Sequence, residues 1–256
     1  MGTFKVRHSG SWTTISNGTA FKVRHGDAWV NPTKVKVRHD GAWVDVWAKS
    51  DPVTLTFTCN ASQGWRNNQW RTDNKVRFGA FKGTESPFTF FGDNLTVLEF
   101  SGDSTTGGYT STSLAEALAV RSNVTSATLT LYRTTGGTNP ISSSTSETLL
   151  VGQHNKVNGT AMSSYNAGSY VQTTNMQTVA ASNLQSWAQN ASKVLTLPSS
   201  GLTDFITHVS AKQMWVSELS TGWVASGGSG STSQIYSVCD GSAQTNKPVL
   251  TVTLDY

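Results

Sequence analysis

One short motif occurs three times in the first 46 residues, and this repetition constrains the fold more than any other feature of the sequence. Each copy joins an alternating basic run to a tryptophan, as in the segment Phe21–Trp29, FKVRHGDAW. The tryptophans Trp12, Trp29 and Trp43 lie 17 and then 14 residues apart. A period this short is typical of small supersecondary units, none of which can bury its own apolar face alone.

Each repeat predicts a β-hairpin with a two-residue turn, because Ser9-Gly10, Gly26-Asp27 and Asp40-Gly41 each separate two β-prone runs. In the third repeat such a turn pairs His39 with Ala42 and continues outward until Val35 lies opposite Val46. Side chains alternate along a strand, so one face of this hairpin is apolar and the other carries Arg38 beside Trp43.

The apolar faces of these hairpins need a partner surface, because an isolated hairpin is only marginally stable in water. We therefore expect residues 1–50 to anchor the chain, either by forming a homo-oligomer or by docking on another protein. The tryptophans of the opposite faces are expected to stack on arginines. The residues assigned to this oligomerisation and anchoring role are Phe4, Val6, Phe21, Val23, Val35, Val37, Trp12, Trp29 and Trp43.

The positive charge of the chain is concentrated in the same segment. The whole sequence has a net charge of +4, but residues 1–50 hold eight Lys and Arg against three Asp, and the remainder holds eleven basic against twelve acidic residues. An acidic partner would dock on the repeats; alternatively, the charges are solvated hairpin faces. No nucleic-acid-binding motif accompanies them, so nucleic acid is not an expected partner.

From residue 51 onward the composition and periodicity are typical of an all-β domain. Charged residues make up only 13% of the chain, which is rich in Ser, Thr, Gly and Asn. The segment 60–71 is interpreted as a polar loop, and short helices are expected at 113–120, 175–189 and 202–214. Alternation predicts strands at 53–59, 94–100, 124–132, 146–151, 194–197, 234–239 and 248–254, with shorter aromatic strands in 76–90.

The predicted architecture has two parts: a hairpin-repeat segment, 1–50, and a jelly-roll-like antiparallel β-sandwich with one to three short helices, 51–256. Cys59 and Cys239 lie near the start and end of the second part, where the first and last strands of a jelly roll are often neighbours. A late disulfide would fit this placement, but two small buried thiols are favoured. Residues 1–20 lack the apolar stretch of a signal peptide, and no apolar run is long enough to insert in a membrane.

Two strand motifs resemble those of DNRLRE-type β-sandwich modules, which are related to carbohydrate-binding jelly rolls: Val124–Tyr132, VTSATLTLY, and Lys247–Thr253, KPVLTVT. The N-terminal repeats and the Trp-Arg segment 65–71 resemble minor tail and tail-fibre proteins of phages that infect actinobacteria. The resemblance implies a virion protein of the phage tail, assembled in the host cytoplasm and trimeric. It would contact other tail proteins and a host-surface glycan during attachment.

No catalytic motif or paired carboxylates stand out in the sequence, so we expect a non-enzymatic protein without cofactor or metal. A polysaccharide depolymerase is the enzymatic alternative. His8, His25 and His39 occupy one position of each repeat. They would meet if copies stacked about an axis and could then hold a metal or an anion; the simpler reading is a partly buried histidine satisfied by backbone.

Binding is the favoured function, because sugars are recognised by exposed aromatic rings rimmed with amides and hydroxyls. One hypothesis is a tail protein that contacts a host glycan through the second domain. The other is a structural decoration or collar protein with protein contacts alone. Aromatic residues in polar, Gly- or Asn-rich surroundings form the candidate ligand-binding platform: Trp65, Trp70, Tyr109, Tyr165, Tyr170 and Trp223.

Overall fold

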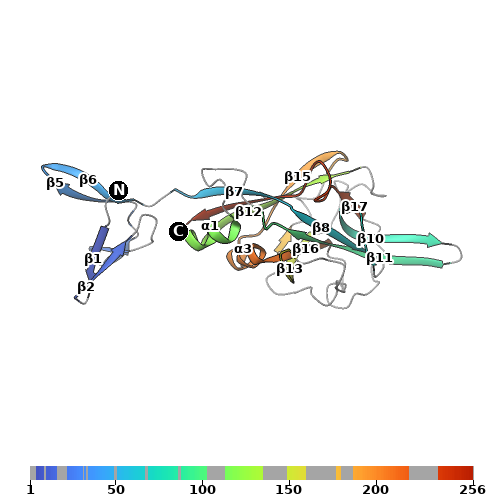
Figure 1. The fold of residues 1–256 in the computed structure, drawn as a ribbon, viewed down its shortest axis with the longest axis horizontal. Helices are drawn as coiled ribbons and strands as arrows, with labels where there is room; N and C mark the ends of the chain where they lie inside the picture. The colour runs from blue at the N-terminus through green and yellow to red at the C-terminus, as the bar shows by residue number, and fades with distance from the viewer. Residues whose placement is uncertain are drawn as a thin grey trace. The chain divides into compact units, whose positions relative to one another are not determined.

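The structure is a computed structural model that describes residues 4–8, 10–15, 22–30, 32, 34–48, 51–66, 69–85, 88–102, 113–134, 149–159, 177–179, 187–218 and 236–255. The chain divides into two compact units. Unit 1 comprises Met1–Val53 with Asp255–Tyr256, and unit 2 comprises Thr54–Leu254. Most of the described residues lie in strands, which confirms the expected all-β class (Figure 1).

The described part of unit 1 contains three antiparallel two-stranded hairpins: β1 (Phe4–His8) with β2 (Ser11–Ile15), β3 (Val23–His25) with β4 (Ala28–Val30), and β5 (Lys34–His39) with β6 (Ala42–Ala48). The turns fall where the sequence predicts them. Asp40 and Gly41 both have positive φ, 49° and 82°, as the tight mirror-image turn of a two-residue hairpin requires. The arginine and tryptophan of each repeat lie opposite one another, as in Arg38↔Trp43.

The third hairpin departs from the predicted register at its open end. The pairing runs as expected from His39↔Ala42 to Lys36↔Asp45, but then shifts, so that Val35 lies opposite Trp47. The predicted pair Val35↔Val46 is therefore wrong. An extra residue in β6 forms a bulge, and alternation alone gives no signal for such an insertion.

Both faces of the second and third hairpins expose apolar side chains within the single chain. Val30, Val37 and Val44 on the apolar faces retain 39%, 41% and 44% of their accessible surface, and Trp29 and Trp43 on the opposite faces retain 67% and 68%. Val23 and Val35 are half-buried. Larger exposed apolar patches mark interaction surfaces in soluble proteins. The other anchor residues, Phe4, Val6, Trp12 and Phe21, have side chains outside the described set.

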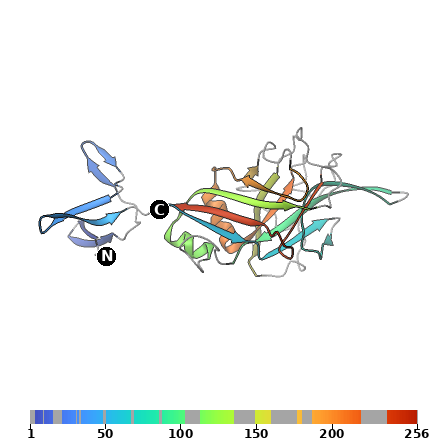
Figure 2. The same cartoon turned by 90° about the horizontal axis from the view of Figure 1, so that it is seen from above.

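Unit 2 begins and ends on neighbouring strands. β7 (Val53–Thr58) lies beside β18 (Val249–Asp255), and β18 lies beside β12 (Asn123–Arg133). Figures 1 and 2 show these three long strands side by side. β12 continues the layer to β15 (Ala191–Thr196) and, at its end, to β17 (Tyr236–Cys239). Apolar and polar residues alternate along β7, β12 and β18, so each strand buries one face and exposes the other.

A second group of strands is centred on β11 (Phe88–Glu99). The end of β11 lies between β8 (Ala61–Arg66) and β16 (Lys212–Glu218), and β16 continues to β13 (Leu149–Val157) and β14 (Gln177–Val179). β10 (Val76–Glu85) pairs with the start of β11 and also with β17, and so joins the two groups. Figure 1 shows the β10–β11 hairpin extending beyond the other strands of unit 2.

Two helices occur in the described part of unit 2, and Figure 1 draws both on one side of the β7–β18–β12 layer. α1 (Leu114–Val120) begins with a capping box in which Ser113 and Glu116 bond each other's backbone N–H groups. α3 (Leu202–Ala211) buries Leu202, Phe205, Ile206 and Val209 against β12 and β16. The helices predicted at 113–120 and 202–214 are thus confirmed, although the second ends at Ala211 because β16 begins at Lys212.

Two other expectations for local structure are wrong. The segment 60–71 is not a loop, since β8 and β9 (Gln69–Trp70) lie within it. β8 places the small residues Ser62 and Gly64 on its buried side, where the chain at 74–77 passes close, so it lacks the apolar alternation of a typical strand. The helix predicted at 175–189 is contradicted at Gln177–Val179, which forms an edge strand on β13; residues 180–186 lie outside the described set.

Both cysteines are free and buried, which confirms the prediction of two thiols rather than a disulfide. Cys59 follows β7, and its backbone N–H donates to Pro248 O at 2.8 Å beside β18. Cys239 instead lies opposite Val76 of β10 and Arg133 of β12. Burial raises the pKa of the Cys59 thiol to about 12 and also raises the pKa of Cys239, so both remain protonated at neutral pH.

Candidate functional site

The structure does not assemble the predicted aromatic platform into one described surface. Trp65 and Trp70 come together as a cross-strand pair of β8 and β9, but their side chains lie outside the described set. Tyr109, Tyr165, Tyr170 and Trp223 lie wholly outside the described residues. The platform as a whole therefore stays a prediction.

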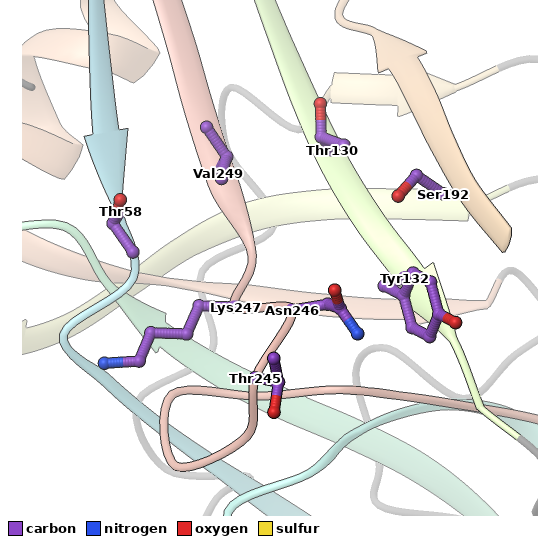
Figure 3. A pocket seen from close by; sticks show the side chains of 8 residues that line it. All are labelled: Thr58, Thr130, Tyr132, Ser192, Thr245, Asn246, Lys247 and Val249. Carbon is purple, nitrogen blue, oxygen red and sulfur yellow. The ribbon is translucent and has the colours of Figure 1, made fainter. Parts of the chain in front are cut away.

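A different surface of unit 2 is hollowed. An open pocket of about 340 Å³ lies on the outer face of the layer formed by β7, β18, β12 and β15. It lies at the end of β7 and beside the loop that leads into β18. We call it the β18 pocket. Figure 3 shows its side chains, which belong to β7, β12, β15, β18 and that loop. The lining residues are Thr58, Thr130, Tyr132, Ser192, Thr245, Asn246, Lys247 and Val249.

Strand alternation explains why these side chains face outward. In β12, Leu129 and Leu131 are fully buried, so Thr130 and Tyr132 must lie on the opposite face. The register of β12 with β15 places Ser192 directly opposite Tyr132. In β18, Leu250 is buried and Val249 faces out to form part of the pocket lining. The pocket is thus a product of the same pattern that builds the core.

The pocket combines a ring, several hydrogen-bonding groups and one cation. Tyr132 offers an aromatic face and a phenol, while the threonine, serine and asparagine side chains both donate and accept hydrogen bonds. Lys247 is exposed and supplies an ammonium group. In Figure 3 its side chain runs to the β7 side, whereas Asn246 points the other way, toward Tyr132. A polyhydroxylated ligand could lie across this surface with a ring face on Tyr132.

The loop between β17 and β18 that carries three pocket residues is held by its own hydrogen bonds. Asp240 Oδ2 accepts from Asn246 N at 3.3 Å and from Asn246 Nδ2 at 3.0 Å. Gly241 N donates to Gln244 Oε1 at 2.7 Å. Asp240 itself is 8% exposed. The loop residues 245–247 are therefore presented by a closed, hydrogen-bonded turn.

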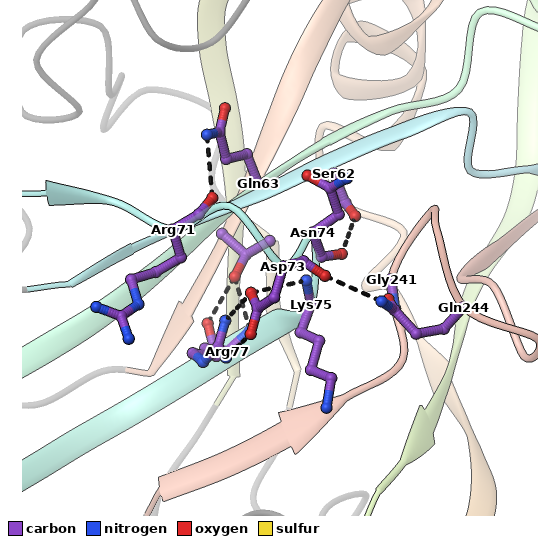
Figure 4. A network of polar contacts seen from close by, with 10 residues as sticks. Ser62, Gln63, Arg71, Asp73, Asn74, Lys75, Arg77, Gly241 and Gln244 are labelled. Atoms are coloured by element: carbon purple, nitrogen blue, oxygen red, sulfur yellow. Dashed lines mark hydrogen bonds and ion pairs between the residues drawn. The ribbon is translucent and has the colours of Figure 1, made fainter.

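A second set of contacts fastens this loop to β8 and to the segment before β10, and Figure 4 shows the contact made by Gln244. Gln244 Nε2 donates to Asp73 O at 2.9 Å, and Ser242 N donates to Ser62 Oγ at 2.8 Å. Asp73 forms a bidentate ion pair with Arg77, and this hydrogen-bonded pairing is the main cause that lowers the pKa of Asp73. The pocket loop is thereby tied to a charged network in the body of unit 2.

Glu99 forms a separate polar cluster in the interior. Its side chain is 3% exposed and accepts four hydrogen bonds. Asn60 Nδ2 and Ser101 Oγ donate to Oε1 at 2.7 and 2.6 Å, and Gly159 N and Gln213 Nε2 donate to Oε2, both at 2.9 Å. Burial opposes ionisation of Glu99, but the four donors outweigh it and lower its pKa. The cluster links Glu99 of β11 and Gln213 of β16 to the residues next to β8 and β13.

The repeat histidines differ from expectation where their side chains are described. His25 is exposed, and His39 is 74% exposed with its Nδ1 3.1 Å from Asp40 Oδ2. The interpretation as partly buried histidines is wrong for these two within the single chain, because both side chains are exposed. Across the described ranges, no cluster of three or more His, Cys, Asp or Glu side chains is arranged to hold a metal ion. None of the helices in those ranges has the length and hydropathy of a membrane span.

Sequence reasoning missed the β18 pocket, although a signal was present. Tyr132 ends the motif VTSATLTLY and continues the polar face of Thr128 and Thr130, so alternation already placed it outward. Alternation cannot show that the loop 245–247 lies close to Tyr132 in the folded chain. Comparisons with protein-family models and with curated proteins gave no match.

Proposed function

We propose that this chain is a non-enzymatic attachment protein whose second unit binds a glycan in the β18 pocket. The observation that carries the proposal is the pocket itself, where an outward Tyr132 is ringed by hydroxyl and amide side chains on a rigid sheet face. Aromatic stacking combined with short polar side chains suits sugar rings, which present apolar C–H faces and hydroxyl rims. Exposure on an open face suits a polymer chain as well as a single sugar.

We further propose that the attachment takes place at a phage tail. This part of the proposal rests on the resemblance of the repeats and of the Trp-Arg segment to minor tail and tail-fibre proteins. The exposed valines and tryptophans of unit 1 support an assembly role for the repeats, with a homotrimer or another tail protein as the partner. Several weak glycan sites on one assembly would raise the total affinity by avidity.

The glycan proposal predicts that Tyr132→Ala weakens binding to isolated host cell walls by about tenfold, because one stacked ring is lost. Surface plasmon resonance of the full-length protein on immobilised cell walls measures the change. Thr196→Ala is the matched control, since Thr196 is exposed on β15 opposite Thr128, outside the pocket. Equal binding by wild type and Tyr132→Ala would place the glycan contact elsewhere, and no binding by either would contradict the function.

The assembly proposal predicts that the double substitution Val37→Lys and Val44→Lys converts the oligomer to a monomer. The two valines form a cross-strand pair of β5 and β6, and two ammonium groups there would oppose burial in an interface. Light scattering of the full-length protein gives the mass. Val120→Lys, at a 57% exposed valine of α1 in unit 2, is the control and should leave assembly intact. A monomeric wild-type protein would refute the proposal.

A further inference from the structure

We propose that the β18 pocket selects a negatively charged sugar unit, in which a carboxylate or a phosphodiester contacts Lys247 while the ring lies against Tyr132. This inference rests on the proposed function and adds the ligand class to it. A neutral polysaccharide would use the ring and the hydroxyl groups but would leave the lysine without a role.

The charge in the pocket is one-sided. Of the eight lining residues, Lys247 is the basic one, and the other seven are Thr, Ser, Asn, Val and Tyr. The pocket lining therefore carries one positive charge and no carboxylate. Residues 51–256 as a whole have a net charge close to zero. An anionic group entering the pocket would meet attraction from the ammonium and hydrogen-bond donors from Asn246 and the threonines.

Lys247 is also placed by its neighbours on both sides. Asn246 is fixed to Asp240 through its backbone N–H and its side-chain amide. Pro248 is buried, and its carbonyl oxygen accepts from Cys59 N at 2.8 Å. The lysine backbone is therefore clamped between two anchored residues, so only the side-chain torsions remain free. A clamped backbone lowers the ordering cost when the ammonium binds an anion.

The positions of Lys247 and Tyr132 suggest how one ligand could use both. Val249, at the start of β18, lies in the same lining, with Thr58 of β7 on one side and Thr130 and Tyr132 of β12 on the other. Figure 3 shows the lysine side chain directed to the β7 side and Asn246 directed to the β12 side. Neighbouring strands lie roughly 4.8 Å apart, and β18 lies between β7 and β12. The distance from β7 to β12 is therefore about two such spacings, which is on the scale of one sugar ring with its substituent.

The test measures binding of the full-length protein to immobilised polymers in charged and neutral pairs. Polygalacturonate, alginate and hyaluronate are each compared with their carboxyl-reduced forms. Poly(glycerol phosphate) is compared with plain polyglycerol. The uronate and phosphate pairs distinguish the two sources of negative charge. We expect at least one charged polymer to bind about tenfold more tightly than its neutral counterpart, with a preference that weakens as salt rises. Lys247→Gln should abolish the preference, whereas Lys75→Gln, which removes the same charge from another part of unit 2, should keep it.

The outcomes separate this inference from the proposed function. Equal binding to charged and neutral forms, lost in Tyr132→Ala, would overturn the inference and leave glycan binding in the pocket standing. A charge preference that survives in Lys247→Gln would also overturn it, because the anion would then be recognised elsewhere. If the protein bound none of the polymers, charged or neutral, the result would count against both the proposed function and this inference.

Discussion

Replacing Glu99 with glutamine is expected to lower the free energy of unfolding by about 3 kcal/mol, although the two side chains have nearly the same shape. Each oxygen of Glu99 accepts two hydrogen bonds, so an amide NH₂ in either orientation would face two donors. Gly159 donates through its backbone N–H, which cannot become an acceptor for the new amide. Asn60 is held in place because its Oδ1 accepts from Ser101 N at 2.9 Å.

The same residue predicts how stability depends on pH. The pKa of Glu99 in the folded protein lies below its ordinary value of 4.5, so folding favours the ionised form. This contribution is fully present above the unfolded-state pKa and is lost as the pH falls through the lower folded-state pKa. Chemical denaturation of wild type between about pH 3 and pH 7 should therefore show stability falling on the acid side, with a shallower fall in Glu99→Gln. Asp73, whose pKa is also lowered, accounts for part of the remaining slope.

Glu116→Gln is the matched control. Glu116 is exposed and belongs to the capping box of α1, and glutamine serves at that position as well as glutamate. We expect its effect to stay within about 0.5 kcal/mol. If Glu99→Gln were as stable as Glu116→Gln at neutral pH, the four hydrogen bonds would not be what stabilises the interior around Glu99.

Much of the fold follows from short-range sequence signals. The Asp-Gly turn of the third repeat fixes the hairpin register from His39↔Ala42 to Lys36↔Asp45, because turn length and register are linked. Alternation identifies β7, β12 and β18, and the Ser-x-x-Glu box locates the start of α1. These features are each decided by residues a few positions apart, so a single sequence contains the information.

The features that sequence reasoning missed depend on contacts between distant segments. β8 is a strand because it pairs with β11, and its buried Ser62 bonds Asn74 O at 2.5 Å rather than packing as an apolar residue would. The β18 pocket needs Tyr132 and Lys247, which are far apart in the sequence, on one surface. The bulge in β6 is an exception, because it lies within one hairpin, but alternation gives no signal for it. Sequence reasoning therefore did not predict the β18 pocket, although its aromatic residue lies in a predicted strand, and the predicted aromatic platform stays a prediction.

Gly241→Ala is expected to lower the free energy of unfolding by about 3–5 kcal/mol, because there is no room for a methyl group at this position. A Cβ on Gly241 would lie 1.7 Å from Asn74 O and 2.5 Å from Ser62 Oγ. Asn74 O belongs to the backbone, and Ser62 is held by Asn74 and by Ser242, so neither atom can withdraw without breaking the network of Figure 4. Thermal and urea unfolding of the full-length protein measure the loss.

Gly102→Ala is the control, because a Cβ there would meet nothing within 4 Å. The same substitution also connects the fold to the proposed site. Gly241 begins the turn that presents Thr245, Asn246 and Lys247, so any shift of the loop that relieved the clash would move these residues away from Tyr132. We therefore expect either a large loss of stability or, where the loop yields, a loss of glycan binding at near-normal stability. Gly241→Ala with both properties intact would mean that the loop is not anchored at Asn74 and that the pocket does not depend on it.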